Sequence, residues 1–166
     1  MEKFDYDVII IGSGVVGLGA SVYSRRFNLK TLILGELLGG TITRTHLVEN
    51  YPGFVSLSGQ ELADHFIEHA KSVQAEIKLE RVKKIIKNEK GFNVITNQNE
   101  YSSKTIIFAT GTEHKKLDVK SVIDFENRGV SYCATCDAPF FKGKPLAVVG
   151  SGDSAAKESL LLSEYG

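Results

Sequence analysis

A run of β-branched residues, Val8 to Ile11, leads directly into three spaced glycines, Gly12, Gly14 and Gly17. Such a run is typical of a strand that is buried on both faces of a parallel sheet. In a strand–glycine turn–helix unit, the first glycine permits the tight turn, the second lets the backbone approach a pyrophosphate, and the third lets helix and strand pack closely. The phosphate charge then lies at the unpaired N–H groups of the helix N-terminus. The pattern predicts a dinucleotide-binding turn; a glycine-rich turn without a ligand is the alternative.

The next elements agree with this prediction. Residues 21–27 have helical spacing, and residues 30–34 form a second short apolar run, which together complete a first βαβ unit of a parallel sheet. In such units an acid that binds the ribose is expected about 20 residues after the glycines, at the end of the second strand. Gly35 occupies the nearest position and Glu36 the following one, so Glu36 is the candidate ribose ligand.

Residues 58–110 complete the expected first domain. Ser58 and Glu61 have capping-box spacing and predict a helix that continues through Ser72. Strand-like pieces follow between residues 75 and 110, with a hairpin at the sequence NQNE. We interpret the basic residues between 81 and 87 as the solvated side of one strand. The predicted class is α/β: a Rossmann-like domain over residues 1–115, with a parallel sheet and a small antiparallel β-hairpin layer.

A second glycine turn follows a polar connector. Residues 146–149 are expected to form a strand, followed by Gly150 and Gly152, with Ala155 at the third position of the fingerprint. A helix is expected from Asp153, which has a side chain able to cap it. Residues 116–166 therefore predict the start of a second Rossmann-like, NAD(P)-binding domain, in incomplete form.

The charge balance excludes some function classes. Twenty Lys and Arg residues are matched by twenty Asp and Glu residues, so there is no basic field to hold a nucleic acid or an anionic membrane. The apolar run at residues 7–22 follows acidic residues and is interrupted by glycines, which does not suit a signal peptide. Two cysteines without such a signal indicate a reducing compartment, and we expect a cytoplasmic protein.

Both cysteines lie in one motif, Cys133 and Cys136, followed at once by Asp137. A structural zinc site needs four ligands, and the four histidines lie well upstream, so we expect no metal. A structural staple is disfavoured because closing so short a loop removes little chain entropy. A redox-active pair remains, since a C-x-x-C near a helix start stabilises one thiolate. Asp137 is then a candidate proton donor or acceptor, with a helix cap or surface acid as the alternative.

The sequences GSGVVG, ENYPGF, FATG and CATCDAPFF occur here in one order. With them the chain resembles the low-molecular-weight thioredoxin reductases. These are flavoproteins that carry electrons from NADPH through FAD to a C-x-x-C pair and on to thioredoxin. The resemblance runs from the first strand to the last residue.

The resemblance implies a role for each motif. It implies that Cys133 and Cys136 form the redox-active disulfide and that Asp137 is the acid–base group. The implied FAD-binding residues are Gly12, Ser13, Gly14, Gly17, Glu36, Gly39, Gly40, Thr41, Asn50, Thr110 and Gly111. The implied NADPH-binding residues are Gly150, Gly152, Ser154 and Ala155. Thioredoxin or a similar small disulfide protein is the implied partner, and full-length members are expected to form homodimers.

Members of that family are roughly twice as long and have two domains. We therefore expect a fragment or a truncated form of a thioredoxin reductase. Two alternatives are a non-catalytic FAD-binding or assembly module, and a related reductase that serves a peroxidase or another disulfide partner.

Overall fold

The computed structural model describes residues 4–112, 115–120, 122–125 and 128–166, with the backbone alone for Ile123 and Cys136. The chain divides into two compact units, Met1–Thr112 and Glu113–Gly166. Sequence composition suggested a boundary between residues 115 and 116, and the observed division falls between Thr112 and Glu113. Which nucleotide each unit binds stays a prediction.

One six-stranded sheet organises the first unit, in the order β3-β2-β1-β6-β5-β4. The strands are β1 (Tyr6–Ile11), β2 (Thr31–Leu34), β3 (Glu76–Lys78), β4 (Val82–Lys87), β5 (Phe92–Thr96) and β6 (Glu100–Phe108). The pairs β1–β2, β1–β6 and β2–β3 are parallel, whereas β4–β5 and β5–β6 are antiparallel. The predicted α/β, Rossmann-like fold with an antiparallel hairpin is therefore confirmed.

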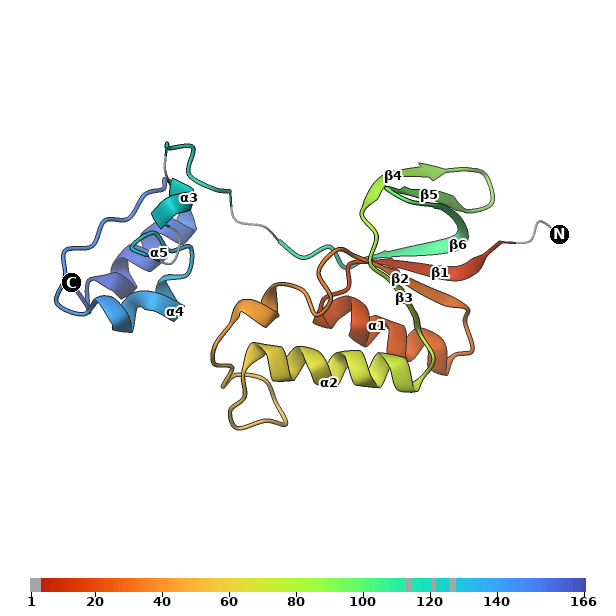
Figure 1. Cartoon of the computed structure of the whole chain (residues 1–166), viewed down its shortest axis with the longest axis horizontal. Helices are drawn as coiled ribbons and strands as arrows, with labels where there is room; N and C mark the ends of the chain where they lie inside the picture. The colour runs from red at the N-terminus through yellow and green to blue at the C-terminus, as the bar shows by residue number, and fades with distance from the viewer. Residues whose placement is uncertain (1–3, 113–114, 121, 126–127) are drawn as a thin grey trace. The chain divides into compact units, whose positions relative to one another are not determined.

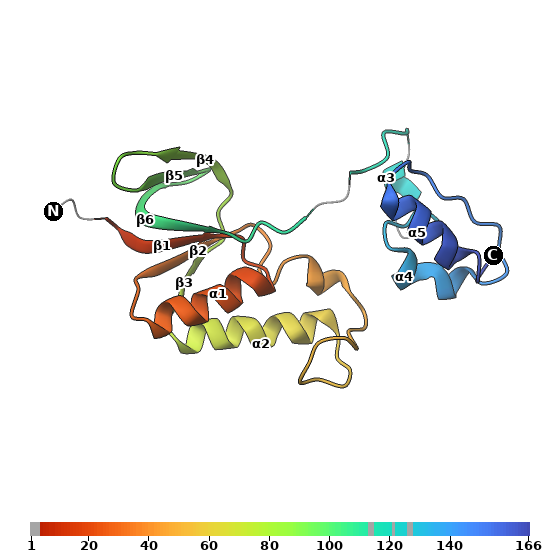
Figure 2. The ribbon, with the colours of Figure 1, turned by 180° about the vertical axis from the view of Figure 1, so that it is seen from behind.

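Two helices and the hairpin cover opposite faces of the parallel strands (Figure 1), and the view from behind shows the same order of layers (Figure 2). On the hairpin face, Ile9 and Ile11 of β1 pack with Val94 and Tyr101. On the helix face, the intervening residue Ile10 packs with Leu18 and Ala70. Successive residues of β1 thus point into two cores, which explains why its sequence is apolar without alternation.

The helices of this unit are α1 (Val15–Arg26), α2 (Gly59–Ser72) and the short 3-10 turn η1 (Thr41–Arg44). The predicted capping box is present: the Glu61 N–H donates to Ser58 Oγ at 3.1 Å and the Ser58 N–H donates to Glu61 Oε2 at 2.7 Å. The first helix begins at Val15, before the predicted start at Ser21, because packing against the sheet overrides the weak helix propensity of Gly17 and Gly19.

The second unit is built from short helices, α3 (Val122–Phe125), α4 (Ala134–Asp137), η2 (Ala138–Phe141) and α5 (Asp153–Leu162). The predicted strand at residues 146–149 is wrong, and Figure 1 draws this segment as coil. A strand requires a neighbour for its backbone hydrogen bonds, and the described residues of this unit contain no other strand. Val149 is accordingly 70% exposed. The predicted helix start at Asp153 is correct. Asp153 does not cap the helix as expected, because Gly152 is the N-cap residue and Asp153 is the first helical residue.

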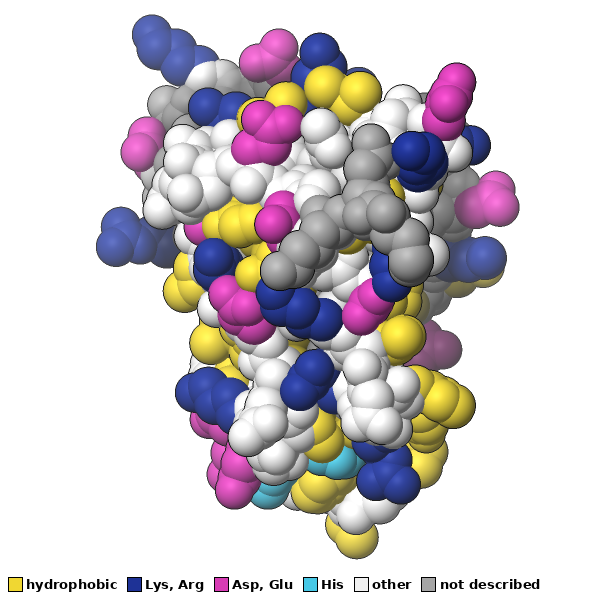
Figure 3. Space-filling view, turned by 90° about the vertical axis from the view of Figure 1, so that its right-hand side faces the viewer, with side chains coloured by type: hydrophobic (Ala, Val, Ile, Leu, Met, Phe, Trp, Pro, Cys, Tyr) yellow, Lys and Arg dark blue, Asp and Glu magenta, His cyan; other side chains and the backbone are white. Residues whose placement is uncertain are grey.

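Two surface properties bear on function. Basic and acidic side chains are interspersed on the face shown in Figure 3, in keeping with the balanced charge of the chain. In the part of the chain that the structure describes, none of the helices has both the length and the apolar character needed to span a membrane.

Candidate functional site

The fold itself requires two of the three glycines in the first turn. Gly12 has a φ of +119°, and a Cβ placed there would lie 1.9 Å from the carbonyl oxygen of Ala109. A Cβ at Gly17 would lie 1.9 Å from the carbonyl oxygen of Gly12. The first glycine therefore permits the turn and the third permits the close approach of α1 to β1, as predicted from their spacing.

Gly14 is different, because nothing in the protein requires a glycine there. Its φ is −81°, which any residue can adopt, and it is the N-cap of α1. A Cβ at this position would meet its nearest atoms, in Gly40 and Gly39, at 3.6 and 3.7 Å, which are ordinary contacts. The first turn of α1 contains no acidic residue that would repel an anion. A helix N-terminus without an acidic residue favours an anion such as a nucleotide pyrophosphate.

The loop after β2 is fastened to this turn. The Ser13 hydroxyl donates to the Leu37 carbonyl at 2.9 Å, and the Gly39 N–H donates to the Ser13 carbonyl at 2.8 Å. Gly39 and Gly40 both have positive φ, and a Cβ at Gly40 would lie 2.7 Å from the Gly14 Cα. These glycines let the loop approach the turn closely, so the structure brings together two segments that sequence reasoning assigned to one ligand.

The remaining predicted residues of this site are exposed. Thr110 and Gly111 follow β6, which is parallel to β1, so they lie at the same carboxyl edge of the sheet as the glycine turn. Gly111 has a φ of +65° and open space around it. Thr41 begins the η1 turn directly after Gly40. Asn50 lies farther along the loop, within the span closed by the Val48–Leu57 bridge.

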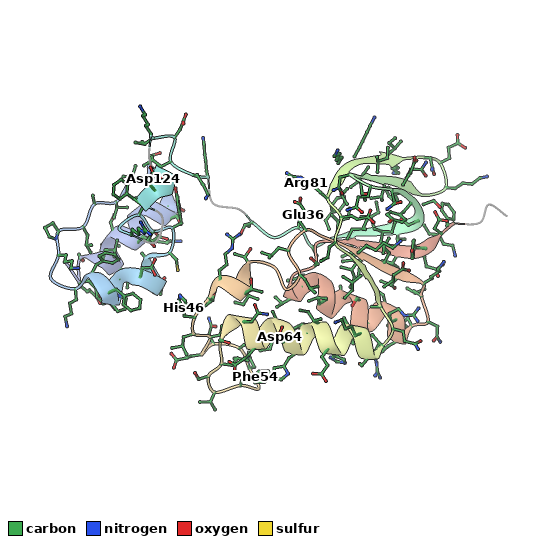
Figure 4. The ribbon with its side chains drawn as sticks, viewed as in Figure 1. Glu36, His46, Phe54, Asp64, Arg81 and Asp124 are labelled. Atoms are coloured by element: carbon green, nitrogen blue, oxygen red, sulfur yellow. The ribbon has the colours of Figure 1, made fainter. Side chains whose placement is uncertain are left out.

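Glu36 forms an ion pair that sequence reasoning missed. Its Oε2 lies 3.6 Å from Nη1 of Arg81, and Figure 4 shows the two side chains near the same end of the sheet. The basic character of residues 81–87 suggested only a solvated strand face. The contact could have been predicted from the sheet topology. Glu36 follows β2 and Arg81 follows β3, and these two strands are parallel and adjacent, so their carboxyl ends lie together.

A buried carboxylate precedes Arg81. Glu80 is 5% exposed and accepts hydrogen bonds from Thr96 Oγ1 at 2.5 Å, Tyr101 OH at 2.8 Å and Asn99 Nδ2 at 2.9 Å. Burial, the largest single influence, raises the pKa of Glu80, but the three donors and the positive charge of Lys78 together hold that pKa below its ordinary value. The acid thus ties the start of β4 to the β5–β6 hairpin.

The second glycine turn lines a shallow hollow of about 240 Å³. Its lining residues are Val148, Gly150, Ser151, Gly152, Ala155, Ala156 and Ser159. Ser154 lies in the first turn of α5 and is exposed. Asp153, also in this turn, places a negative charge at the helix N-terminus, where a phosphate would be repelled. The hollow is therefore a less favourable anion site than the turn at Gly14.

The cysteine motif lies at a helix start, as expected. Cys133 immediately precedes α4, and Asp137 ends it, with the Asp137 N–H donating to the Cys133 carbonyl at 3.1 Å. The side chain of Cys136 lies outside the described residues. Ser131, which sequence reasoning missed, donates its hydroxyl proton to Asp137 Oδ2 at 2.5 Å and accepts from the Cys133 N–H at 3.0 Å. Ser131 therefore connects the acid to the backbone of the first cysteine.

Among the described residues, His, Cys, Asp and Glu side chains do not gather in groups of three that could hold an ion.

The sequence and the structure were compared with known proteins. A family model described as pyridine nucleotide-disulphide oxidoreductase matches residues 6–166. The thioredoxin reductase of Bacillus subtilis (strain 168) is 45% identical over 165 residues, which cover 99% of this chain and 52% of that protein. The thioredoxin reductase of Treponema pallidum (strain Nichols) is 44% identical over 161 residues, covering 96% of this chain and 52% of that protein.

Solved structures agree with this match. The thioredoxin reductase from Streptococcus pyogenes MGAS5005 aligns with a TM-score of 0.80 and 40% identity, covering 96% of this chain and 53% of that one. The chain spans about half the length of the relatives it matches. The resemblance inferred from the motifs is confirmed, and the chain belongs to the pyridine nucleotide-disulphide oxidoreductase family.

Proposed function

We propose that this chain is part of an NADPH-dependent thioredoxin-disulfide reductase. In this proposal residues 1–115 hold FAD, residues 116–166 begin the NADPH-binding domain, and Cys133 and Cys136 form the redox-active disulfide. The observation that carries the proposal is the position of Cys133, which lies directly before α4 and one helical turn before Asp137, in a chain with only two cysteines. The names of the matched relatives support it.

The fit of the first unit to FAD rests on Gly14. Gly14 is the N-cap of α1, and the N–H groups at the start of this helix, with no acidic residue in its first turn, suit a pyrophosphate. At the same edge of the sheet, a Cβ on Gly111 would meet nothing within 4 Å, so this position is open to a ligand. The hollow at Gly150 to Ala155 is the proposed NADPH site.

The proposed chemistry assigns a task to each group of the cysteine motif. FAD held by the first unit would supply two electrons, which NADPH would provide as a hydride. The electrons break the Cys133–Cys136 bond, and one of the two resulting thiolates attacks the disulfide of the partner. A mixed disulfide forms, and the leaving thiolate of the partner takes a proton from Asp137 in its carboxylic acid form, which solvent then restores. The second cysteine then attacks the mixed disulfide, which releases the reduced partner and restores the Cys133–Cys136 bond.

Ser131 supports these steps by holding Asp137. Its hydroxyl donates to the carboxylate while its oxygen accepts from the Cys133 N–H, so the acid is oriented toward the turn that carries the first cysteine. We further propose thioredoxin or a similar small disulfide protein as the partner, a homodimer for the full-length protein, and a cytoplasmic location.

Flavin binding and thiol release test the proposal separately. FAD is titrated into the purified chain and its fluorescence and visible absorption are recorded. The complex is then reduced with dithionite and excess reductant is removed. The released thiols are counted with a chromogenic disulfide, with Cys133→Ser as the control. We expect FAD binding and the appearance of two thiols on reduction, whereas the control, which retains one cysteine, gives one thiol both before and after reduction.

The two failures have different meanings. A colourless chain that does not alter FAD fluorescence would contradict the assignment of the first unit. FAD binding without thiol release would instead favour a non-catalytic FAD-binding module, which is the second candidate because the chain spans about half the length of its relatives. Replacing the chromogenic disulfide by thioredoxin, and then by another disulfide protein, tests which partner the reduced chain prefers.

A further inference from the structure

The ion pair between Glu36 and Arg81 lies at a defined place in the fold. Strands β2 and β3 are parallel and in register at Leu34 and Lys78, so the residues that follow them emerge at the same edge of the sheet. There the Glu36 carboxylate and the Arg81 guanidinium approach to 3.6 Å (Figure 4). In a dinucleotide-binding fold this edge receives the adenosine ribose.

The backbone N–H and carbonyl of Arg81 both form hydrogen bonds with one residue of the β5–β6 hairpin, Asn97. Its N–H donates to Asn97 Oδ1 at 2.9 Å, and its carbonyl accepts from the Asn97 N–H at 3.0 Å. The preceding residue, Glu80, is buried and held by three side-chain donors. The hairpin thus anchors the base of the Arg81 side chain, while its charged end stays in contact with solvent.

The two side chains of the pair favour different riboses: one with free hydroxyls and one with a 2′-phosphate. A carboxylate accepts hydrogen bonds from ribose hydroxyls but repels a 2′-phosphate. A guanidinium attracts a 2′-phosphate and binds it through paired N–H donors. Here the side chains of Glu36 and Arg81 are 60% and 68% exposed, so both are accessible to a ligand while they neutralise each other.

We propose that Arg81 is a nucleotide-positioning residue, which orients Glu36 in a ribose clamp selective for an adenosine nucleotide with a free 2′-hydroxyl. This inference rests on the proposed FAD site in the first unit. Arg81 restrains the carboxylate, and Glu36 occupies the guanidinium that would otherwise bind a 2′-phosphate. The hairpin layer therefore contributes to nucleotide choice through a residue that is far from the glycine turn in sequence.

Each member of the clamp has a distinct expected effect. Arg81→Ala leaves the carboxylate unrestrained and weakens ADP binding about threefold, the scale of one exposed ion pair. Arg81→Lys retains the charge and restores most of that loss. Glu36→Ala removes the ribose acceptor and frees Arg81, so ADP binds more weakly and adenosine 2′,5′-bisphosphate binds more tightly. In the double variant Glu36→Ala/Arg81→Ala, the gain for the 2′-phosphate disappears.

Calorimetric titration of ADP and of adenosine 2′,5′-bisphosphate into the full chain tests the clamp, with displacement of bound FAD as a second readout. Lys87→Ala is the matched control, since it removes one positive charge from an exposed residue at the other end of β4. We expect this variant to bind both nucleotides like the unsubstituted chain.

The outcomes separate the clamp from the site on which it depends. Unchanged ADP affinity in Arg81→Ala, or no gain for the 2′-phosphate in Glu36→Ala, would overturn the clamp while leaving the FAD site intact. An unsubstituted chain that binds neither ADP nor FAD would overturn the proposed function together with the clamp. Thermal unfolding of every variant establishes that the fold is retained.

Discussion

Replacing Gly14 by alanine tests whether this glycine serves the ligand and not the fold. The φ of −81° suits alanine, and the added Cβ makes only ordinary contacts at 3.6 and 3.7 Å. Removing a glycine stabilises by about 0.4–1 kcal/mol through the unfolded chain. Alanine is a poorer N-cap than glycine, at a cost of up to about 1 kcal/mol. The free energy of unfolding is therefore expected to change by less than about 1 kcal/mol.

Nucleotide binding is expected to respond more strongly. The new methyl group would lie between the N-terminus of α1 and the Gly39–Gly40 loop, in contact with both, directly beside the place that we assign to the pyrophosphate. Inserting a methyl group into a close-packed contact costs about 1–3 kcal/mol. Since about 1.4 kcal/mol is a factor of ten in affinity, FAD is expected to bind roughly 5- to 150-fold more weakly.

Two glycines within α1, Gly17 and Gly19, provide controls. Gly17→Ala places a Cβ 1.9 Å from the Gly12 carbonyl oxygen, so the helix must move from the sheet and a loss of more than about 3 kcal/mol is expected. Gly19→Ala places a Cβ 3.4 Å from the Phe66 ring and is expected to stabilise the helix by up to about 1 kcal/mol with unchanged FAD affinity.

Urea unfolding followed by circular dichroism, together with FAD titration, measures both quantities on the same samples. The reasoning fails if Gly14→Ala unfolds as readily as Gly17→Ala, because the fold would then require the glycine. It also fails if Gly14→Ala binds FAD as tightly as the unsubstituted chain.

Two other substitutions address the buried acid and the cysteine motif. Glu80→Ala removes the acceptor of the Asn99 and Tyr101 donors, while the Thr96 hydroxyl retains the Asn99 carbonyl at 3.0 Å, and should cost about 2–3 kcal/mol in urea unfolding, whereas Glu80→Gln should cost less. Because the folded pKa of Glu80 is lowered, its contribution is present above its unfolded pKa and is lost as pH falls through its folded pKa. Stability should therefore decline less steeply toward acid in Glu80→Gln, and an unaltered slope would contradict this role. Ser131→Ala should slow thiol–disulfide exchange of the reduced chain with a chromogenic disulfide about tenfold, since a charge-assisted hydrogen bond to Asp137 is lost. Ser131→Thr should restore the rate, and equal rates in all three proteins would show that Ser131 does not act through Asp137.

The elements that were predicted correctly have local causes. The strand β1 follows from a β-branched run, and α2 follows from the capping box at Ser58 together with helical spacing. Gly12 and Gly17 could be assigned because their roles depend on residues within one βαβ unit. Such features are determined by a few neighbouring residues, which is why sequence alone identified them.

The errors and omissions have non-local causes. The run at residues 146–149 has strand composition, but strand formation depends on a partner that the described residues of the second unit lack. Arg81 was missed because its contact with Glu36 joins the ends of two parallel strands and becomes visible only once their pairing is known. Ser131 has a more local signal, since serine often accepts a hydrogen bond from the N–H two residues later, here that of Cys133.

The two glycine turns show how packing, and not the motif alone, prepares a phosphate site. At the first turn, the backbone is held by contacts so close that Gly12 and Gly17 admit no side chain, and the N–H groups at the start of α1 are fixed relative to β1. At the second turn, a Cβ on Gly152 would meet nothing within 4 Å, and the segment before it is unpaired. A ligand at the second turn therefore has fewer neighbouring protein atoms around Gly152, and it must bind against the charge of Asp153. Although the glycine spacing is similar, we expect the first turn of this chain to bind a nucleotide more tightly than the second.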